Sequence, residues 1–259
     1  DYPVKIHCLG CPEKNPWHPA KDERRVERMI DPAMMEREFP GIVIEETKDQ
    51  GWTWAELDQV DEKHSGAPRP EVDALKLLAV FVQHSDNKAD NQRLACYPEE
   101  IRDPSGKGIG FCDHPVMMVA DLGSTFGGGD SMVMQKMELE GWAKTDIWSS
   151  VQENAYFIKN HKKVCFGNLT NSISAGDVGL RDPMISEAGR KFLADLLNQL
   201  SDKQIEDLFR VSRADQVPHM IHENGTQAVV TIDDWANAFK KKRDQINQRQ
   251  CAIILEETK

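Results

Sequence analysis

The sequence predicts an α+β fold, with a small strand-bearing part near the N-terminus and a larger helical part after it. Residues 2–8 alternate apolar and polar side chains, and residues 41–46 form a short apolar run, as strands do. Residues 71–84, 185–200 and 202–211 instead repeat apolar side chains three or four positions apart, which is the spacing of a helix. We therefore expect short strands early in the chain and helices through most of the remainder.

Two further helical segments are expected in the first part. Residues 22–30 are rich in charge and predict one or two helical turns. In the Trp-rich stretch 51–57, Thr53 is the expected N-cap of a helix, and Glu56 would complete its capping box. The composition of residues 62–70, with Gly and Pro, predicts a loop before the next helix.

The helix expected at 71–84 should be buried nearly all round, because its apolar residues occupy most positions. Short apolar elements follow at 92–96 and 111–120, and the second of these ends in an expected strand. Nearer the C-terminus, Ser186 is the expected N-cap of one helix, and a further helix runs from Thr231 towards Asn247.

Composition excludes several classes of protein. Hydrophobic residues make up 39% and charged residues 29% of the chain, which favours a soluble globular protein. The net charge of −11 argues against a general binder of nucleic acid or of anionic membranes. No apolar run approaches the roughly 20 residues that span a bilayer. The basic run 240–243 is expected to be a solvated face of the last helix.

The cysteine count bears on the compartment. An even number of cysteines is compatible with three disulfides and favours an exported or periplasmic location over a reducing one. Cys96 and Cys112 bracket an insert that contains Pro and Gly, so a bridge between them would close an easily stapled loop. Cys8 and Cys11 have zinc-ligand spacing, but no second pair completes a four-ligand set, so we favour disulfides or free thiols. The six residues are Cys8, Cys11, Cys96, Cys112, Cys165 and Cys251.

Two acid-bearing turns carry the chemistry. Residues 84–91, which we call the octet loop, read His-Ser-Asp-Asn-Lys-Ala-Asp-Asn and follow the apolar helix, while Asp121-Leu-Gly follows a short apolar strand. Transfer of phosphate from ATP requires a carboxylate near the acceptor hydroxyl, an Asn and Asp pair that holds Mg²⁺, and a nearby cation. The side chains that supply these groups are Asp86, Asn91, Asp121 and Lys88.

These two motifs resemble parts of the protein-kinase active site. The octet loop is similar to the catalytic loop H-R-D-L-K-x-x-N, and Asp121-Leu-Gly is similar to the D-F-G motif. The resemblance implies that Asp86 is the catalytic base and that Lys88 contacts phosphate. It implies that Asn91 and Asp121 hold Mg²⁺ or Mn²⁺ with ATP, and that His84 braces the loop.

The resemblance also implies an architecture. Residues 1–66 would form a partial N-terminal lobe with the hinge region, and residues 67–259 would form the helical C-terminal lobe of a kinase-like α+β fold. Ser85 replaces the usual Arg, and Asp121 follows Asn91 by 30 positions, which is unusually far. These departures point to an atypical branch, such as the lipid-kinase-like, HipA-like or secreted Fam20-like groups. The octet loop and the stretch near Trp52 also resemble a family of uncharacterised bacterial proteins.

Other kinase motifs are missing from the sequence. No Gly-rich phosphate loop or Val-Ala-Ile-Lys strand precedes residue 84, and no Ala-Pro-Glu follows Gly123. The first two lie either upstream of Asp1 or nowhere in the protein. We expect a Mg²⁺-dependent ATP phosphotransferase whose acceptor hydroxyl lies on a protein, a lipid or a small molecule. The alternatives are a pseudokinase-type interaction module and, more weakly, a metal-dependent hydrolase that uses the same acids.

The remaining motifs favour structural roles. The six tryptophans are expected to pack in the core or between lobes, and Gly127–Gly129 does not match a phosphate-binding loop and predicts a flexible segment. His219 and His222 have metal-like spacing but lack neighbouring ligands in the sequence. None of these motifs predicts a second chemical site.

Overall fold

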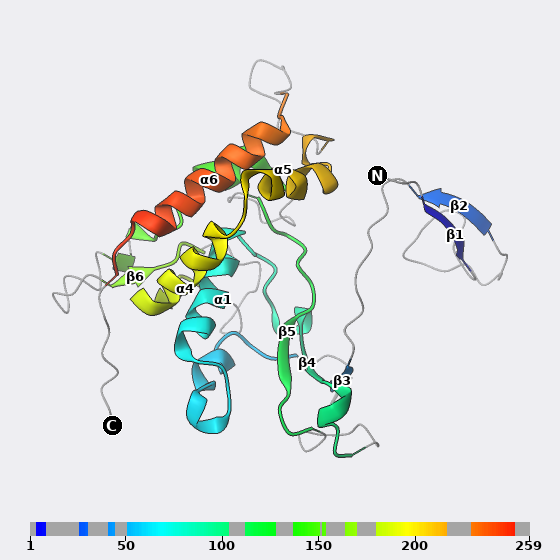
Figure 1. Cartoon of the computed structure of the whole chain (residues 1–259), viewed down its shortest axis with the longest axis vertical. Helices are drawn as coiled ribbons and strands as arrows, with labels where there is room; N and C mark the ends of the chain where they lie inside the picture. The colour runs from blue at the N-terminus through cyan, green and yellow to red at the C-terminus, as the bar shows by residue number, and fades with distance from the viewer. Residues whose placement is uncertain are drawn as a thin grey trace. The chain divides into compact units, whose positions relative to one another are not determined.

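The chain divides into two compact units, residues 1–39 and 40–259, which we describe separately (Figure 1). The computed structural model describes the backbone of two strands in the first unit. In the second unit it describes residues 41–44, 51–103, 112–127, 137–150, 152–153, 164–169, 180–216 and 229–251.

The first unit contains an antiparallel hairpin of strands. β1 (Val4–Cys8) pairs with β2 (Val26–Ile30), so that Val4 lies opposite Ile30 and Cys8 opposite Val26. The strand expected at 2–8 is confirmed for residues 4–8, but the helical turns expected at 22–30 are wrong for residues 26–30, which form a strand. Residues 22–25 lie outside the described residues. Pairing with β1 satisfies the backbone of the segment Val-Glu-Arg-Met-Ile, and this tertiary contact outweighs a local charge pattern that resembles a helix. The possible zinc ligand Cys11 lies outside the described residues.

The second unit contains a three-stranded antiparallel sheet in the order β3-β4-β5. Ile42 of β3 lies opposite Cys96 of β4, and Gln92 of β4 lies opposite Val119 of β5. β4 begins directly after the octet loop, and β5 ends two residues before Asp121, so the sheet fixes the position of both turns. The strands are β3 (Ile42–Ile44), β4 (Gln92–Cys96) and β5 (Val116–Val119). The sequence predicts β3 and β5 as strands, whereas it predicts only a short apolar element where β4 lies.

Helices dominate the rest of the second unit, so the fold is α+β with small antiparallel sheets, as the sequence predicts. The helices expected from periodicity are confirmed: the bounds of α5 are those predicted, and the ends of the others differ by one to three residues. The described helices are α1 (Arg69–Phe81), α2 (Leu139–Lys144), α4 (Glu187–Asn198), α5 (Asp202–Val211) and α6 (Ile232–Gln248), and a two-stranded sheet joins β6 (Cys165–Phe166) to β7 (Met184–Ile185).

Side-chain caps explain where the later helices begin. The Ser186 hydroxyl accepts a hydrogen bond from the N–H of Gly189 at 3.1 Å, as predicted for the start of α4. The helix expected at 51–57 is only a 3₁₀ helix, Glu56–Gln59, and its N-cap is Ala55. The Glu56 carboxylate does accept hydrogen bonds from the N–H and hydroxyl of Thr53, so half of the expected capping box is present.

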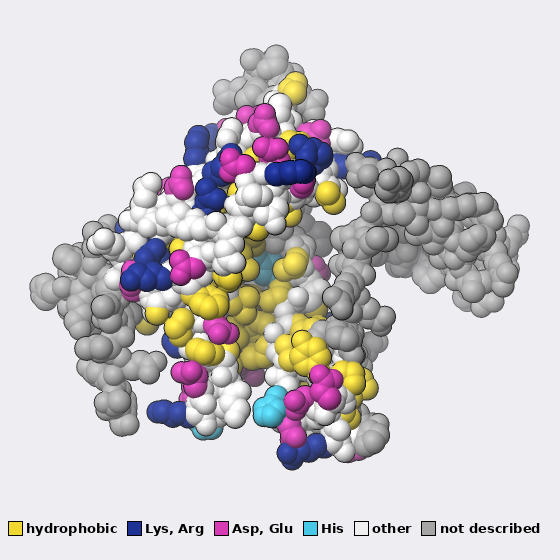
Figure 2. Space-filling view, in the orientation of Figure 1, with side chains coloured by type: hydrophobic (Ala, Val, Ile, Leu, Met, Phe, Trp, Pro, Cys, Tyr) yellow, Lys and Arg dark blue, Asp and Glu magenta, His cyan; other side chains and the backbone are white. Residues whose placement is uncertain are grey.

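The core surrounds α1. Leu77, Val80 and Phe81 are fully buried, and hydrophobic side chains gather around α1 and between it and strands β4 and β5 (Figure 2). The edge of Phe81 meets the ring of Trp142 with centroids 6.0 Å apart, and Trp142 stacks on Trp235 at 5.8 Å. The prediction that the tryptophans pack in the core is confirmed for Trp52, Trp54, Trp142 and Trp235.

Two disulfides join distant parts of the second unit. Cys96–Cys112 closes the predicted loop, and Cys165–Cys251 links β6 to the segment after α6 across 86 positions. Disulfides are compatible with an oxidising, exported location. Among the described residues, no helix combines the length and apolar character needed to cross a bilayer.

Lys242 departs from the expectation of a solvated basic run. Its side chain is 1% exposed, its Nζ donates to the Thr145 carbonyl at 2.5 Å, and it lies 5.4 Å from the centroid of the Trp142 ring. Burial lowers the pKa of Lys242 to about 8, although the Asp146 carboxylate acts in the opposite direction. One residue of the basic run 240–243 is therefore buried, because every third or fourth side chain of a helix faces the same side.

The depressed pKa of Lys242 predicts how stability depends on pH. Between pH 8 and the ordinary value of 10.5, the unfolded chain binds more protons than the folded chain, so the free energy of unfolding rises with pH. We expect the wild type to gain about 2 kcal/mol relative to Lys242→Met between pH 7.5 and 10. Urea unfolding at several pH values measures this. The exposed variant Lys241→Met should show the same dependence of unfolding free energy on pH as the wild type. If Lys242→Met also showed the wild-type dependence, the lowered pKa of Lys242 would be contradicted.

Candidate functional site

The octet loop and the turn after β5 lie side by side. The N–H groups of Ala120 and Asp121 donate to the Asn91 carbonyl at 3.0 and 3.1 Å, and the N–H of Ser85 donates to the Ser124 carbonyl at 3.1 Å. These backbone contacts join the two motifs at both ends. The four residues to which sequence reasoning assigned chemistry therefore belong to one hydrogen-bonded unit.

The end of α1 sets the direction of the octet loop. The helix ends at Phe81, three residues earlier than predicted, because Gln83 has a φ of 53° and turns the chain away. The Gln83 side chain holds this turn by donating to the carbonyls of Val80 at 2.9 Å and Asn168 at 2.8 Å. The next residue, His84, is buried and is the first residue of the octet loop.

Asn87 is the internal brace of the octet loop. Its side chain is fully buried, and its Nδ2 donates to the His84 carbonyl at 2.9 Å. Its Oδ1 accepts the N–H of Leu180 at 3.0 Å, which ties the loop to the segment before β7. Sequence reasoning gave this residue no role, because its partner lies 93 positions away and no local pattern reveals it.

Asn91 connects the loop to its candidate base. Its Nδ2 donates to the Asp86 carbonyl at 2.7 Å, and the residue is 8% exposed. No described residue donates a hydrogen bond to Asn91 Oδ1, so this oxygen can accept a ligand. Asn91 thus holds the backbone of Asp86 in place while keeping one oxygen available.

The candidate base and the candidate phosphate contact are neighbours. The Asp86 side chain is 18% exposed, and Lys88 Nζ lies 3.7 Å from its Oδ1. Lys88 is 46% exposed, so solvent weakens this ion pair and it contributes little to stability. Both groups are therefore partly accessible, so that Lys88 can turn towards a bound anion and Asp86 can accept a hydrogen bond from a hydroxyl.

Asp121 sits in a tight turn. Its Oδ1 accepts the N–H of Gly123 at 2.7 Å, and the following Leu122 is 65% exposed. A Cβ at Gly123 would lie 2.9 Å from Asp121 Oδ1, so glycine lets the carboxylate fold back onto the turn. This leaves the second oxygen of Asp121 as the group that can face a ligand.

His84 lies within electrostatic reach of both carboxylates. The side chain is 2% exposed, and burial lowers its pKa below the ordinary value, while the Gly123 backbone and the charges of Asp86 and Asp121 act in the opposite direction. Its ring meets the edge of the Trp54 ring with centroids 6.4 Å apart. The neutral imidazole is thus a packing element between the two turns.

The backbone of the Trp-rich stretch 51–57 packs directly against the octet loop. A Cβ at Gly51 would lie 2.0 Å from the Ala89 carbonyl oxygen and 2.3 Å from that of Gln92, so the two backbones are in direct contact. The next residue, Trp52, donates its indole N–H to the carbonyls of Arg93 at 3.1 Å and Met118 at 3.0 Å. Sequence reasoning assigned this stretch to packing, and the glycine beside two tryptophans was the only local signal of its contact with the loop.

The site has the donor chemistry of a hard divalent cation but few protein ligands. Among the described residues, no group of three or more His, Cys, Asp and Glu side chains is arranged to hold a metal ion. Asn91 and Asp121 supply amide and carboxylate oxygens, which are the donors that Mg²⁺ and Mn²⁺ prefer. A cation held there would complete its coordination with water and phosphate oxygens, which is common for Mg²⁺ in nucleotide sites.

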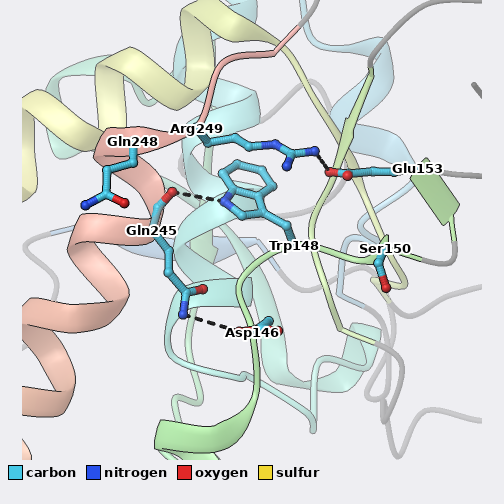
Figure 3. Close-up of a pocket in the computed structure, with 7 residues that line it drawn as sticks. All are labelled: Asp146, Trp148, Ser150, Glu153, Gln245, Gln248 and Arg249. Atoms are coloured by element: carbon cyan, nitrogen blue, oxygen red, sulfur yellow. Dashed lines mark hydrogen bonds and ion pairs between the residues drawn. The ribbon is translucent and has the colours of Figure 1, made fainter.

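A hollow at the end of α6 is built mostly from groups that already have partners. It has a volume of about 460 Å³, and Trp148, Gln245 and Arg249 are among the side chains that line it (Figure 3). Arg249 Nε donates to Cys165 Sγ at 3.4 Å, which connects the hollow to the Cys165–Cys251 disulfide. Arg249 lies over the Trp148 ring, 5.6 Å from its centroid, and pairs with Glu153. The Trp148 indole donates to the Gln245 carbonyl at 3.1 Å. These contacts anchor the segment directly after α6, so we assign the hollow a structural role.

Comparison with family models, with curated proteins and with solved structures found no match to this chain. The site is therefore interpreted from its own geometry. The expectations for Gly128 and Gly129, and for His219 and His222, fall outside the described residues.

Proposed function

We propose that the second unit binds ATP with Mg²⁺ or Mn²⁺ and transfers its terminal phosphate to a hydroxyl group. The observation that carries this proposal is the link made by Asn91, whose side chain donates to Asp86 and whose carbonyl accepts the N–H of Asp121. One residue thus positions the candidate base relative to the candidate metal ligand. Phosphoryl transfer depends mainly on such positioning and on charge stabilisation.

Each side chain has a role that its environment supports. The Asp86 carboxylate accepts no hydrogen bond from a described donor, so it can accept the proton of an acceptor hydroxyl. Asn91 Oδ1 and Asp121 would hold the cation, which neutralises phosphate charge when bound. Lys88 is long and exposed, and it can swing from Asp86 to a phosphate oxygen.

The kinase-like architecture is part of the same proposal. α1 precedes the octet loop and β5 precedes the Asp-Leu-Gly turn, in the order that the resemblance implies. We keep residues 67–259 as the proposed helical lobe and residues 1–66 as the proposed partial N-terminal lobe. The acceptor is a hydroxyl on a protein, a lipid or a small molecule.

Replacing the candidate base tests the mechanism. We expect Asp86→Asn to lower ATP turnover by about a hundredfold or more, because the amide cannot accept a proton. ATP binding should persist, since Asp86 is not one of the proposed metal ligands. The measurement is release or transfer of labelled phosphate by the full chain, beside calorimetric binding of ATP.

Asp90 offers a matched control within the same loop. Its side chain is exposed and we assign it no role, so Asp90→Asn should retain wild-type turnover. Undiminished turnover by Asp86→Asn would contradict the assigned base. A folded protein that binds no ATP would instead favour a pseudokinase-type interaction module, and release of phosphate to water with no acceptor would favour a hydrolase.

A further inference from the structure

A second hollow lies between the start of α1, the 3₁₀ helix Glu56–Gln59 and the segment before β7. Its volume is about 400 Å³, within the range of small-molecule sites. Its lining combines apolar and charged residues: the apolar ones are Trp54, Ala55, Leu180, Pro183 and Met184, and the charged ones are Asp58, Arg69, Lys76, Arg181 and Asp182.

The carboxylates of this hollow are already engaged. Asp58 Oδ1 accepts Lys76 Nζ at 2.6 Å and pairs with Arg69 at 3.0 Å. Burial raises the pKa of Asp58, but Lys76 and Arg69 lower it below the ordinary value, so the carboxylate stays ionised. Asp182 Oδ1 accepts the N–H of Leu169 at 3.1 Å.

The cations of the hollow have donors to spare. Lys76 is 4% exposed, and Asp58 takes one of its three N–H groups. Arg181 is exposed and makes no ion pair or hydrogen bond with another described residue. In a chain with a net charge of −11, this local excess of unused donors favours an anion.

Trp54 supplies part of the apolar surface of the hollow. The residue is 2% exposed, and its indole N–H is buried without an acceptor among the described residues, so this N–H is not available to a ligand in the hollow. Arg181 and Lys76 supply donors from two separate segments that line the same hollow.

We propose that this hollow binds a small organic oxyanion, a carboxylate or a phosphate ester with a compact apolar body. The oxyanion accepts from Arg181 and Lys76, and the apolar body packs on Trp54 and Met184. The site is linked to the octet loop by two routes. The Trp54 ring meets the His84 ring with centroids 6.4 Å apart. The Leu180 N–H donates to Asn87 Oδ1, and Asn87 Nδ2 donates to the Leu180 carbonyl. Occupation therefore stabilises the octet loop.

The test uses the full chain and two probes that share one apolar body, benzoate and phenyl phosphate, at constant ionic strength. Tryptophan fluorescence reports binding, and hydrogen exchange at the Leu180 amide reports the link to Asn87. We expect saturable binding of at least one probe with slower exchange at Leu180. Which probe binds identifies the anion as a carboxylate or a phosphate ester.

Three variants locate the binding. Arg181→Met should weaken binding by about tenfold or more, because a charge-assisted contact is lost at an exposed position that does not support the fold. Lys241→Met removes a remote exposed cation and should bind as the wild type does. Lys88→Met should also retain binding, which separates this hollow from the proposed phosphate contact.

Two results would overturn the proposal. One is the absence of saturable binding by either probe to the folded wild type. The other is unchanged binding by Arg181→Met, including the case in which Lys88→Met alone loses it and the anion thus sits at the octet loop. Neither result depends on ATP turnover, so both are distinct from a failure of the proposed function.

Discussion

Replacing Gly51 by alanine is expected to destabilise the second unit by at least about 3 kcal/mol, or to prevent it from folding. The new Cβ would stand 2.0 Å from the Ala89 carbonyl oxygen and 2.3 Å from that of Gln92. Both atoms are backbone, so the octet loop itself must move. That movement would break the adjoining hydrogen bonds from Trp52 to Arg93 and Met118.

Urea unfolding of the purified variant measures this effect, and Gly123→Ala provides a comparison. A Cβ at Gly123 would meet a side-chain oxygen of Asp121 at 2.9 Å, which can turn away, so its stability should fall much less. Equal unfolding midpoints for Gly51→Ala and the wild type would contradict the close backbone contact between Gly51 and the octet loop.

Removing the Cys165–Cys251 disulfide is expected to cost about 4.6 kcal/mol. The bridge spans 86 positions, and closing a longer loop restricts the unfolded chain more. It also holds the segment after α6, where the Cys251 N–H donates to Glu187 Oε2 at 2.9 Å. Glu187 in turn pairs with the buried Arg190, whose guanidinium donates to the Ile246 carbonyl at 2.8 Å.

The second described disulfide is an internal standard for this prediction. Cys96–Cys112 spans 16 positions, so the same reasoning assigns its removal about 3 kcal/mol. Double alanine variants of each pair, compared by chemical denaturation, should rank the longer bridge as the more stabilising. A smaller loss for the Cys165–Cys251 pair than for the Cys96–Cys112 pair would contradict the account of how the chain end is anchored.

Local patterns in the sequence were sufficient for the later helices. In α4, α5 and α6 the apolar spacing and the capping residue coincide, and Ser201 and Thr231 complete capping boxes in the structure. Within the segment 22–30, where helical turns were expected, residues 26–30 form β2 because they pair with β1. The octet loop and the Asp-Leu-Gly turn were visible because their residues are close together in the chain.

Long-range contacts could not be read from the sequence in the same way. Asn87 meets Leu180, Trp52 meets Met118, and Cys165 meets Cys251 across 66 to 93 positions. A single sequence carries no signal that pairs such residues. Lys242 was assigned to solvent because it sits among other cations, and only the packing of α6 on Trp142 shows that it is buried.

We propose that Asn91 and Asp121 together form the metal end of a nucleotide site. Calorimetric titration of ATP into the full chain, with and without Mg²⁺, tests it most directly when Asp121→Asn and Asp90→Asn are measured beside the wild type. We predict Mg²⁺-dependent binding that Asp90→Asn retains and that Asp121→Asn weakens by about tenfold or more, because an amide replaces a charged ligand. Binding that is indifferent to Mg²⁺, or equal in Asp121→Asn and the wild type, would contradict the claim.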